Sequence, residues 1–200
     1  QHNLVNITPS VIIAKKLGIS DDQIKKSIKT FKGLPHRLEF VANINGVDYY
    51  NDSLATNPHA TIAALEAFSD KNIILIAGGY DRGLDYSELA EKISKLKACP
   101  EQGRGIKKLI LFPDTGQKIF DELKKLSTST LVTKLLSNSK FVRSMPQAIE
   151  NASQIAKPGN IVLLSPASAS FNMFEDYADR GNQFKTAVSA TNQSHSAEKN

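Results

Sequence analysis

Two amphipathic helices are predicted at the start of the chain. Residues 6–17 carry apolar side chains at helical spacing. A second helix follows Ser20, a residue type that caps helix N-termini well. Its apolar side chains recur every three or four residues, which predicts a buried stripe made of Ile24, Ile28 and Phe31.

The helical pattern is interrupted at Gly33 and Pro35, so we predict a domain boundary after Gly33. Two predicted strands, 39–44 and 47–51, then flank the dipeptide Asn45-Gly46. This dipeptide favours a type I′ turn, because both central residues of that turn need positive φ. The second domain is therefore expected to begin with a β-hairpin.

Helices and strands alternate after the hairpin. Helices are predicted at 58–68, 86–96, 116–126, 146–156 and 173–188, and strands at 72–77, 107–112, 140–142 and 160–164. The apolar runs Ile73–Ile76 and Ile161–Leu164 suit strands that are buried on both faces. This alternation predicts an α/β fold, a Rossmann-like and mostly parallel sheet with flanking helices. The polar residues 189–200 have no periodicity and are expected to be a disordered tail.

Composition narrows the class of protein. The net charge is +5, but the lysines are scattered along predicted helices, which is typical of a solvated face rather than a nucleic-acid site. No apolar run approaches the roughly 20 residues of a membrane span. The single Cys99 fits a reducing compartment better than a disulfide scaffold. We expect a cytoplasmic protein without nucleic-acid or membrane partners.

Polar segments follow three of the predicted strands, at Asn51-Asp52-Ser53, Gly78–Gly83 and Ser165–Ser168. In an open parallel sheet, ligands bind beyond the carboxyl ends of the strands. The first segment also leads into a helix start with Asn57 as N-cap and Pro58 as first helical residue, where free backbone N–H groups attract anions. The sequence therefore predicts a pocket for an anionic ligand at this edge.

Simpler interpretations of single residues stay open at this point. Gly78-Gly79 is also what a plain tight turn needs, and Arg82 is also an ordinary surface residue type. His36 beside Arg37 fits a core histidine next to a solvent-facing arginine. The sequence has no Cys/His cluster, no GxSxG elbow and no GxGxxG loop, which argues against a zinc site, an α/β-hydrolase and a dinucleotide dehydrogenase.

Four ordered motifs resemble the Mur ligases, and among them the D-glutamate-adding members. They are Gly33–Glu39 (GLPHRLE), Asn51–Pro58 (NDSLATNP), Gly78–Gly83 (GGYDRG) and Leu164–Phe171 (LSPASASF). The resemblance covers about residues 2–188. It implies that residues 1–33 are the end of a central ATP-binding domain and that residues 34–188 are the C-terminal domain, followed by the tail 189–200.

The family resemblance implies an ATP- and Mg²⁺-dependent amide ligase of peptidoglycan precursor synthesis. Such an enzyme joins D-glutamate to UDP-N-acetylmuramoyl-L-alanine through an acyl phosphate and is expected to act as a monomer. Matched motif by motif, the residues implied on the nucleotide side are Asn3, Asn6, His36, Arg37 and Asp52. Those implied around D-glutamate are Thr56, Arg82, Ser170, Phe171 and Tyr177.

Two departures from the family pattern matter. Leu54 stands where the family usually has a lysine that neutralises charge near the reacting phosphate, so no catalytic residue is certain. The phosphate-binding loop G-x-x-x-x-G-K-[ST] and the family's metal ligands are absent from the sequence. We therefore expect this chain to be inactive by itself, with ATP and Mg²⁺ bound mainly by an upstream part.

Two rival functions remain. One is another ligase of the Mur or folylpolyglutamate type, which would carry related loops. The other is a non-catalytic Rossmann-like binding module, an interpretation that Leu54 favours.

Overall fold

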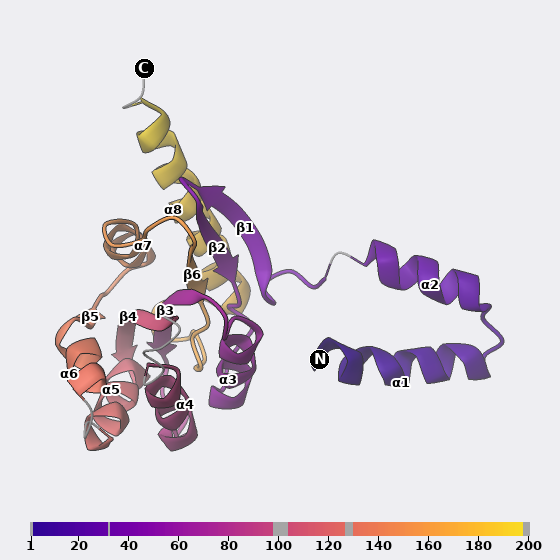
Figure 1. The fold of residues 1–200 in the computed structure, drawn as a ribbon, viewed down its shortest axis with the longest axis horizontal. Coiled ribbons are helices and arrows are strands. Elements are labelled where there is room, and N and C mark those ends of the chain that lie inside the picture. Colours follow the sequence, from indigo (N-terminus) through magenta and orange to yellow (C-terminus); the bar gives the residue numbers. More distant parts are fainter. Residues whose placement is uncertain (1, 32, 98–103, 127–129, 198–200) are drawn as a thin grey trace. The chain divides into compact units, whose positions relative to one another are not determined.

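The computed structural model describes residues 2–31, 33–97, 104–126 and 130–197. It divides into two compact units, residues 1–34 and 35–200, which are considered separately below. Figure 1 labels the helices and strands of both units. Cys99 lies outside the described residues.

The first unit consists of α1 (His2–Lys16) and α2 (Asp21–Thr30). Ser20 caps α2 as predicted: its Oγ accepts a hydrogen bond from Gln23 N at 3.4 Å, and its own N–H donates to Gln23 Oε1 at 3.2 Å.

The predicted apolar stripe of α2 was wrong for two of its three residues. Ile24 is buried, but Ile28 is 44% exposed and Phe31 is 68% exposed. Two short helices offer too little facing surface to cover a whole stripe, so helical spacing alone overestimated burial here.

The second unit is built on a six-stranded sheet with the order β1-β2-β6-β3-β4-β5. The strands are β1 (Glu39–Ile44), β2 (Val47–Asn51), β3 (Asn72–Gly79), β4 (Gly105–Asp114), β5 (Lys140–Phe141) and β6 (Asn160–Leu164). Among the strands that the structure describes, β1 and β2 pair antiparallel and the other neighbouring strands pair parallel. The positive φ values of Asn45 (51°) and Gly46 (80°) fit the predicted hairpin turn. The predicted mostly parallel α/β fold with an N-terminal hairpin is confirmed.

Helices cover both faces of this sheet, as Figure 1 shows. They are α3 (Pro58–Ala67), α4 (Ser87–Lys97), α5 (Thr115–Lys125), α6 (Thr130–Ser137), α7 (Met145–Ser153) and α8 (Tyr177–Ala197). The first four pack on one face and the last two on the other, because their apolar side chains belong to two separate core clusters. The unit is a three-layer α/β/α sandwich.

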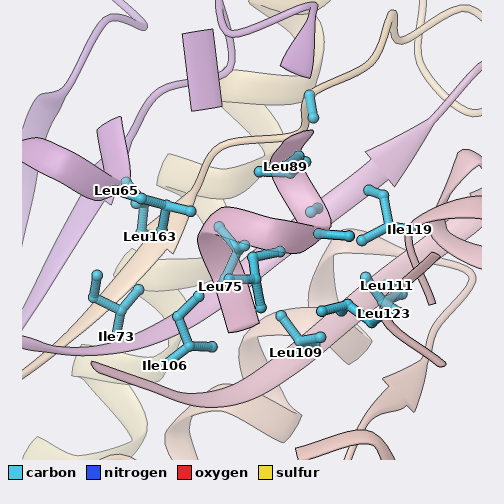
Figure 2. Packing of buried hydrophobic residues seen from close by; sticks show 14 of the residues in the cluster. Leu65, Ile73, Leu75, Leu89, Ile106, Leu109, Leu111, Ile119, Leu123 and Leu163 are labelled. Atoms are coloured by element: carbon cyan, nitrogen blue, oxygen red, sulfur yellow. The ribbon is translucent and has the colours of Figure 1, made fainter. Parts of the chain in front are cut away.

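Figure 2 shows the larger cluster, in which Leu75 of β3 and Leu109 of β4 lie among leucines and isoleucines of the covering helices. Ile73–Ala77 is completely buried. Burying one such side chain contributes about 1.5–3 kcal/mol, so the central strands supply much of the stability of the sheet.

Two segments differ from the predictions. The short helix α6 was not predicted. The last helix begins at Tyr177 rather than residue 173, and it continues through Ala197 in the segment expected to be disordered. Phe184 and Val188 anchor this helix in the core, and an anchored helix extends at little further cost because only its nucleation is unfavourable.

Among the described residues, no helix is both long enough and apolar enough to span a bilayer.

Candidate functional site

The loops that follow β2, β3 and β6 meet at one edge of the sheet, because β6 lies between the other two strands. Asp52 N donates to Leu164 O at 2.8 Å, and Gly78 N donates to Pro166 O at 2.8 Å. These backbone bonds continue the parallel ladders past the ends of the strands. The three polar segments picked out in the sequence are therefore adjacent in space.

Asp52 is a buried carboxylate at this edge, only 4% exposed. Its Oδ1 accepts from Leu38 N at 3.1 Å and its Oδ2 accepts from Ser165 Oγ at 2.8 Å. Burial raises the pKa of Asp52 to about 6, and the two hydrogen bonds and the charge of Arg37 oppose that shift. Asp52 thus ties residue 38 and the β6 loop to the end of β2.

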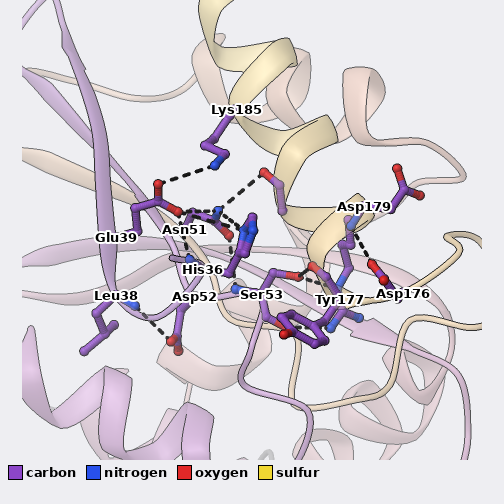
Figure 3. A network of polar contacts seen from close by, with 12 residues as sticks. His36, Leu38, Glu39, Asn51, Asp52, Ser53, Asp176, Tyr177, Asp179 and Lys185 are labelled. Atoms are coloured by element: carbon purple, nitrogen blue, oxygen red, sulfur yellow. Dashed lines mark hydrogen bonds and ion pairs between the residues drawn. The ribbon is translucent and has the colours of Figure 1, made fainter. Parts of the chain in front are cut away.

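His36 is buried within a polar network, shown in Figure 3. Its Nδ1 lies 3.0 Å from Asn51 Nδ2, and its backbone N–H donates to Glu39 Oε2 at 2.9 Å. Burial is the main cause that lowers the pKa of His36, with the charge of Lys185 second. A neutral ring accepts the Asn51 amide proton at Nδ1, so this residue is placed as the core histidine of the simpler interpretation.

Gly181 of α8 packs directly on this network. A Cβ at this position would overlap the His36 ring and would lie 3.0 Å from Asn51 Nδ2. The neighbouring Arg37 is exposed. The two adjacent residues therefore have different roles: the buried His36 holds the backbone in place, and the exposed Arg37 is accessible to a ligand.

Arg180 is a buried residue that residue-by-residue analysis did not select for the site. It is fully buried, and burial lowers the pKa of its guanidinium to about 9. Its spacing of four from Phe184, and of eight from Val188, marks it as part of the buried face of α8. That spacing is the signal by which the sequence could have placed it.

The residues implied around D-glutamate differ in exposure. Ser170 is buried, whereas Phe171 is 65% exposed and its ring lies 6.2 Å from that of Tyr80. Tyr80 N donates to Ala169 O at 2.9 Å, so the β3 and β6 loops stay paired at this point. Arg82, two residues further along, is exposed.

Thr56 and Tyr177 lie near the end of β2. Thr56 is half-buried, and its N–H donates to Leu54 O at 2.9 Å. The Tyr177 ring centroid is 6.1 Å from that of His36, and its carbonyl accepts from Ser53 Oγ at 2.7 Å. The structure thus places Thr56, Arg82 and Ser170, from three distant segments, in loops at the same edge.

Asn3 and Asn6 are in α1 of the other unit, and their side chains are outside what the structure describes.

A buried hydroxyl cluster beneath the loops was also missed by sequence analysis. Ser168 Oγ lies 2.9 Å from Tyr86 Oη and 2.6 Å from Thr115 Oγ1, and Thr115 Oγ1 donates to Gly79 O at 3.0 Å. A Cβ at Gly79 would overlap the carbonyl oxygen of Ala169. The glycine pair is therefore needed for close approach of neighbouring backbones.

Within the described ranges, no three His, Cys, Asp or Glu side chains are grouped so that they could hold a metal ion. Besides the buried Asp52 carboxylate and the His36–Asn51 pair, the polar groups at this edge include hydroxyls, backbone N–H groups and arginines. Such groups bind and orient anions.

Comparison with known proteins agrees with this architecture. Two solved structures share the fold: MurF from Acinetobacter baumannii (TM-score 0.57, 18% identity, 84% of this chain and 35% of that one) and the Thermotoga maritima MurF ligase in complex with ADP (TM-score 0.55, 17% identity, 94% and 39%). Identities this low support the fold alone.

Curated relatives are much closer in sequence. The UDP-N-acetylmuramoylalanine–D-glutamate ligase of Caldicellulosiruptor bescii is 42% identical over 188 residues, covering 94% of this chain and 37% of the relative. The ligase of that name from Aquifex aeolicus is 37% identical over 187 residues, covering 94% and 40%. The chain therefore spans about two-fifths of the length of these relatives.

The profile of the family described as "Mur ligase, glutamate ligase domain" matches residues 36–168, which is most of the second unit. The match includes the loops after β2 and β3 and Ser165–Ser168 of the loop after β6, and it ends before Ser170 and Phe171. This chain belongs to the Mur ligase family.

Proposed function

We propose that this chain is the C-terminal part of a cytoplasmic, monomeric, ATP-dependent ligase that adds D-glutamate to UDP-N-acetylmuramoyl-L-alanine in peptidoglycan precursor synthesis. The observation that carries the proposal is the convergence of three polar loops, bearing Thr56, Arg82 and Ser170, at one edge of the sheet. The names of the relatives that are 37–43% identical over most of the chain support the same substrate.

The proposed chemistry needs positioning and charge neutralisation. ATP phosphorylates the substrate carboxylate to an acyl phosphate, the amine of D-glutamate attacks the carbonyl carbon, and phosphate leaves from the tetrahedral intermediate. Arg82 offers a guanidinium fork to a glutamate carboxylate, and Thr56 and Ser170 offer hydroxyls. Phe171 and Tyr177, both exposed in part, would border the ligand.

On the nucleotide side we propose Asn3, Asn6, His36, Arg37 and Asp52. Arg37 is exposed and suited to direct contact with phosphate, whereas the buried His36 and Asp52 would act by holding residues 36–38 in place. Residues 1–33 would belong to the central ATP-binding domain. ATP and Mg²⁺ would be held mainly by an upstream part of the protein, as in the family.

The test is a chimera in which this chain follows the upstream part of the Caldicellulosiruptor bescii relative. We expect phosphate release that requires both UDP-N-acetylmuramoyl-L-alanine and D-glutamate, and none from the 200-residue chain alone. Release with L-alanine, diaminopimelate or a folate substrate instead of D-glutamate would identify another ligase of the family. Phosphate release by the 200-residue chain alone would contradict the proposal that an upstream part of the protein binds ATP and Mg²⁺.

A second candidate function rests on Leu54, which occupies the position of the family lysine. Without that cation the domain would act as a non-catalytic binding module. Calorimetry of the chain separates the two functions: tight binding of a ligand unrelated to glutamate or ADP, together with an inactive chimera, would favour the module.

A further inference from the structure

The guanidinium of Arg180 is a buried cation without a carboxylate partner. Among the residues that the structure describes, no Asp or Glu oxygen lies within 4 Å of it, and all its recorded partners are uncharged. Burying an unpaired charge is costly, so a fold that keeps one needs a compensating role for it.

The three contacts of Arg180 join segments that are far apart in the sequence. Its Nε donates to Ser53 Oγ at 2.9 Å and its Nη2 to Ser53 O at 2.9 Å, while its Nη1 donates to Ala169 O at 3.2 Å. Ser53 belongs to the loop after β2, and Ala169 belongs to the loop after β6. The planar fork of one arginine therefore fastens both loops to α8.

The same contacts fix the first turn of α8. Ser53 Oγ, which accepts from Arg180, donates its own proton to Tyr177 O at 2.7 Å. Ala169 O also accepts from Tyr80 N, so the Nη1 contact reaches the β3 loop as well. Arg180 thus holds every segment that carries a residue proposed for D-glutamate, either by a direct hydrogen bond or through one further hydrogen bond.

The positive charge of Arg180 also lies close to the loops that its hydrogen bonds join. Nη1 lies 3.2 Å from the position that a Cβ at Gly79 would take, so the cation is directly beneath the β3 loop. A positive charge in a buried, low-dielectric position raises the potential of the adjacent surface more than an exposed one does. An amino acid with two carboxylates, such as D-glutamate, would supply the missing counter-charge when bound at this edge.

We propose that Arg180 is a positioning residue of the amino-acid pocket, which holds the loops of Thr56 and Ser170 and the first turn of α8 together and favours an anionic acceptor through its unpaired charge. This inference rests on the proposed function, because it assigns the edge to D-glutamate. Arg180 itself does not contact the substrate.

The test compares Arg180→Lys, which keeps the charge and loses the fork, with Arg180→Gln, which loses both. In the chimera described above, we expect the KM for D-glutamate to rise about tenfold for Lys and further for Gln, with the KM for ATP within about twofold of the parent. Arg104→Lys is the matched control, because Arg104 is exposed and precedes β4 at the opposite edge of the sheet. This control is expected to leave both constants unchanged.

Ser53→Ala provides a milder variant if neither change at Arg180 folds. It removes the acceptor of Nε and the donor to Tyr177 O but leaves the backbone acceptor, so a smaller rise of about threefold is expected. A purely structural role would lower the melting temperature and kcat at constant KM, and that pattern would overturn the inference. An inactive parent chimera would overturn the proposed function and this inference with it, whereas an active parent with an unchanged D-glutamate KM in the variants would overturn the inference alone.

Discussion

At the scale of single residues, the edge of the sheet is dominated by polar groups that the fold itself uses. Asp52 and His36 are buried and bonded to neighbouring loops, while Arg37 and Arg82 are exposed. Buried polar groups must be bonded to be tolerated, so the first pair specifies the loop conformation and the second pair remains available to a ligand.

Asp52 is expected to make stability depend on pH. Its pKa is raised from 3.8 to about 6 in the folded state, so the folded protein binds a proton more tightly than the unfolded chain does. The contribution of Asp52 to the free energy of unfolding is full below pH 3.8 and is lost as pH rises through about 6. The free energy of unfolding then falls by up to about 3 kcal/mol. Urea unfolding from pH 3.5 to 7 should show this decrease, and Asp52→Asn should remove it. An identical pH dependence in both proteins would contradict the prediction.

Gly181→Ala is expected to destabilise the second unit by about 1–3 kcal/mol, because the added Cβ would overlap the His36 ring. The free energy of unfolding in urea measures this change. Asn182→Ala, at the next and exposed position of α8, is the control and should stay within about 0.5 kcal/mol of the parent. Equal stability of the two variants would show that the His36 ring and its hydrogen-bond partners shift to accommodate the added Cβ without cost.

Leu54→Lys restores the charge that the family pattern has at this position. We expect the chimera carrying it to release phosphate at least about tenfold faster, because a cation near a transferring phosphoryl group stabilises its transition state. Steady-state rates with saturating substrates check this. A lower or equal rate would mean that another group already supplies the charge, or that the domain does not act in catalysis.

At the scale of elements, the strand ends and helix starts decide what the site can hold. Helix α3 begins directly after the β2 loop, where Asn57 Oδ1 accepts from Ala60 N at 2.9 Å and Pro58 is the first helical residue. Pro58 has no N–H, Ala60 N is used by the cap and Thr61 N donates to Asn57 O at 3.5 Å. This helix start therefore favours an anion near Thr56 mainly through its dipole.

Asn57→Ala should lower the free energy of unfolding by about 1 kcal/mol, because the N-cap hydrogen bond is lost. Asn57→Asp keeps an acceptor oxygen and should restore most of that loss. Chemical denaturation of the three proteins at pH 7 provides the comparison. If the alanine variant is as stable as the parent, the cap contributes nothing in this loop.

At the scale of the whole molecule, both core clusters belong to the second unit, from which every strand of the described structure comes. The first unit keeps large apolar side chains exposed, including Ile13 and Leu17. Stability is therefore expected to reside in the α/β sandwich.

A polypeptide of residues 35–197 should accordingly fold by itself and melt within a few degrees of the 200-residue chain. Circular dichroism at 222 nm against temperature measures both transitions. A markedly lower melting temperature would show that residues 1–34 stabilise the sandwich, against the division into two compact units.

Most elements of this fold, apart from α6 and the bounds of α8, followed from the sequence because each depends on neighbouring residues. The Asn45-Gly46 turn, the Ser20 cap and the buried runs of β3 and β6 carry local signals that survive in any surroundings. The order of polar segments at strand ends also predicted which loops would meet, since parallel strands end at one edge.

Only the tertiary structure determined which polar side chains are buried and which residues they contact. Arg180 fastens Ser53 and Ala169 across more than a hundred residues of sequence, and His36 is buried because Gly181 leaves room for its ring. Which polar side chain faces a ligand and which is enclosed depends on segments adjacent in space and distant along the chain. Local patterns carry no information on such contacts. For this reason the sequence alone determined most helices and strands and the edge of the sheet where the polar loops meet, whereas tertiary packing decided which of those polar side chains are buried and which are exposed.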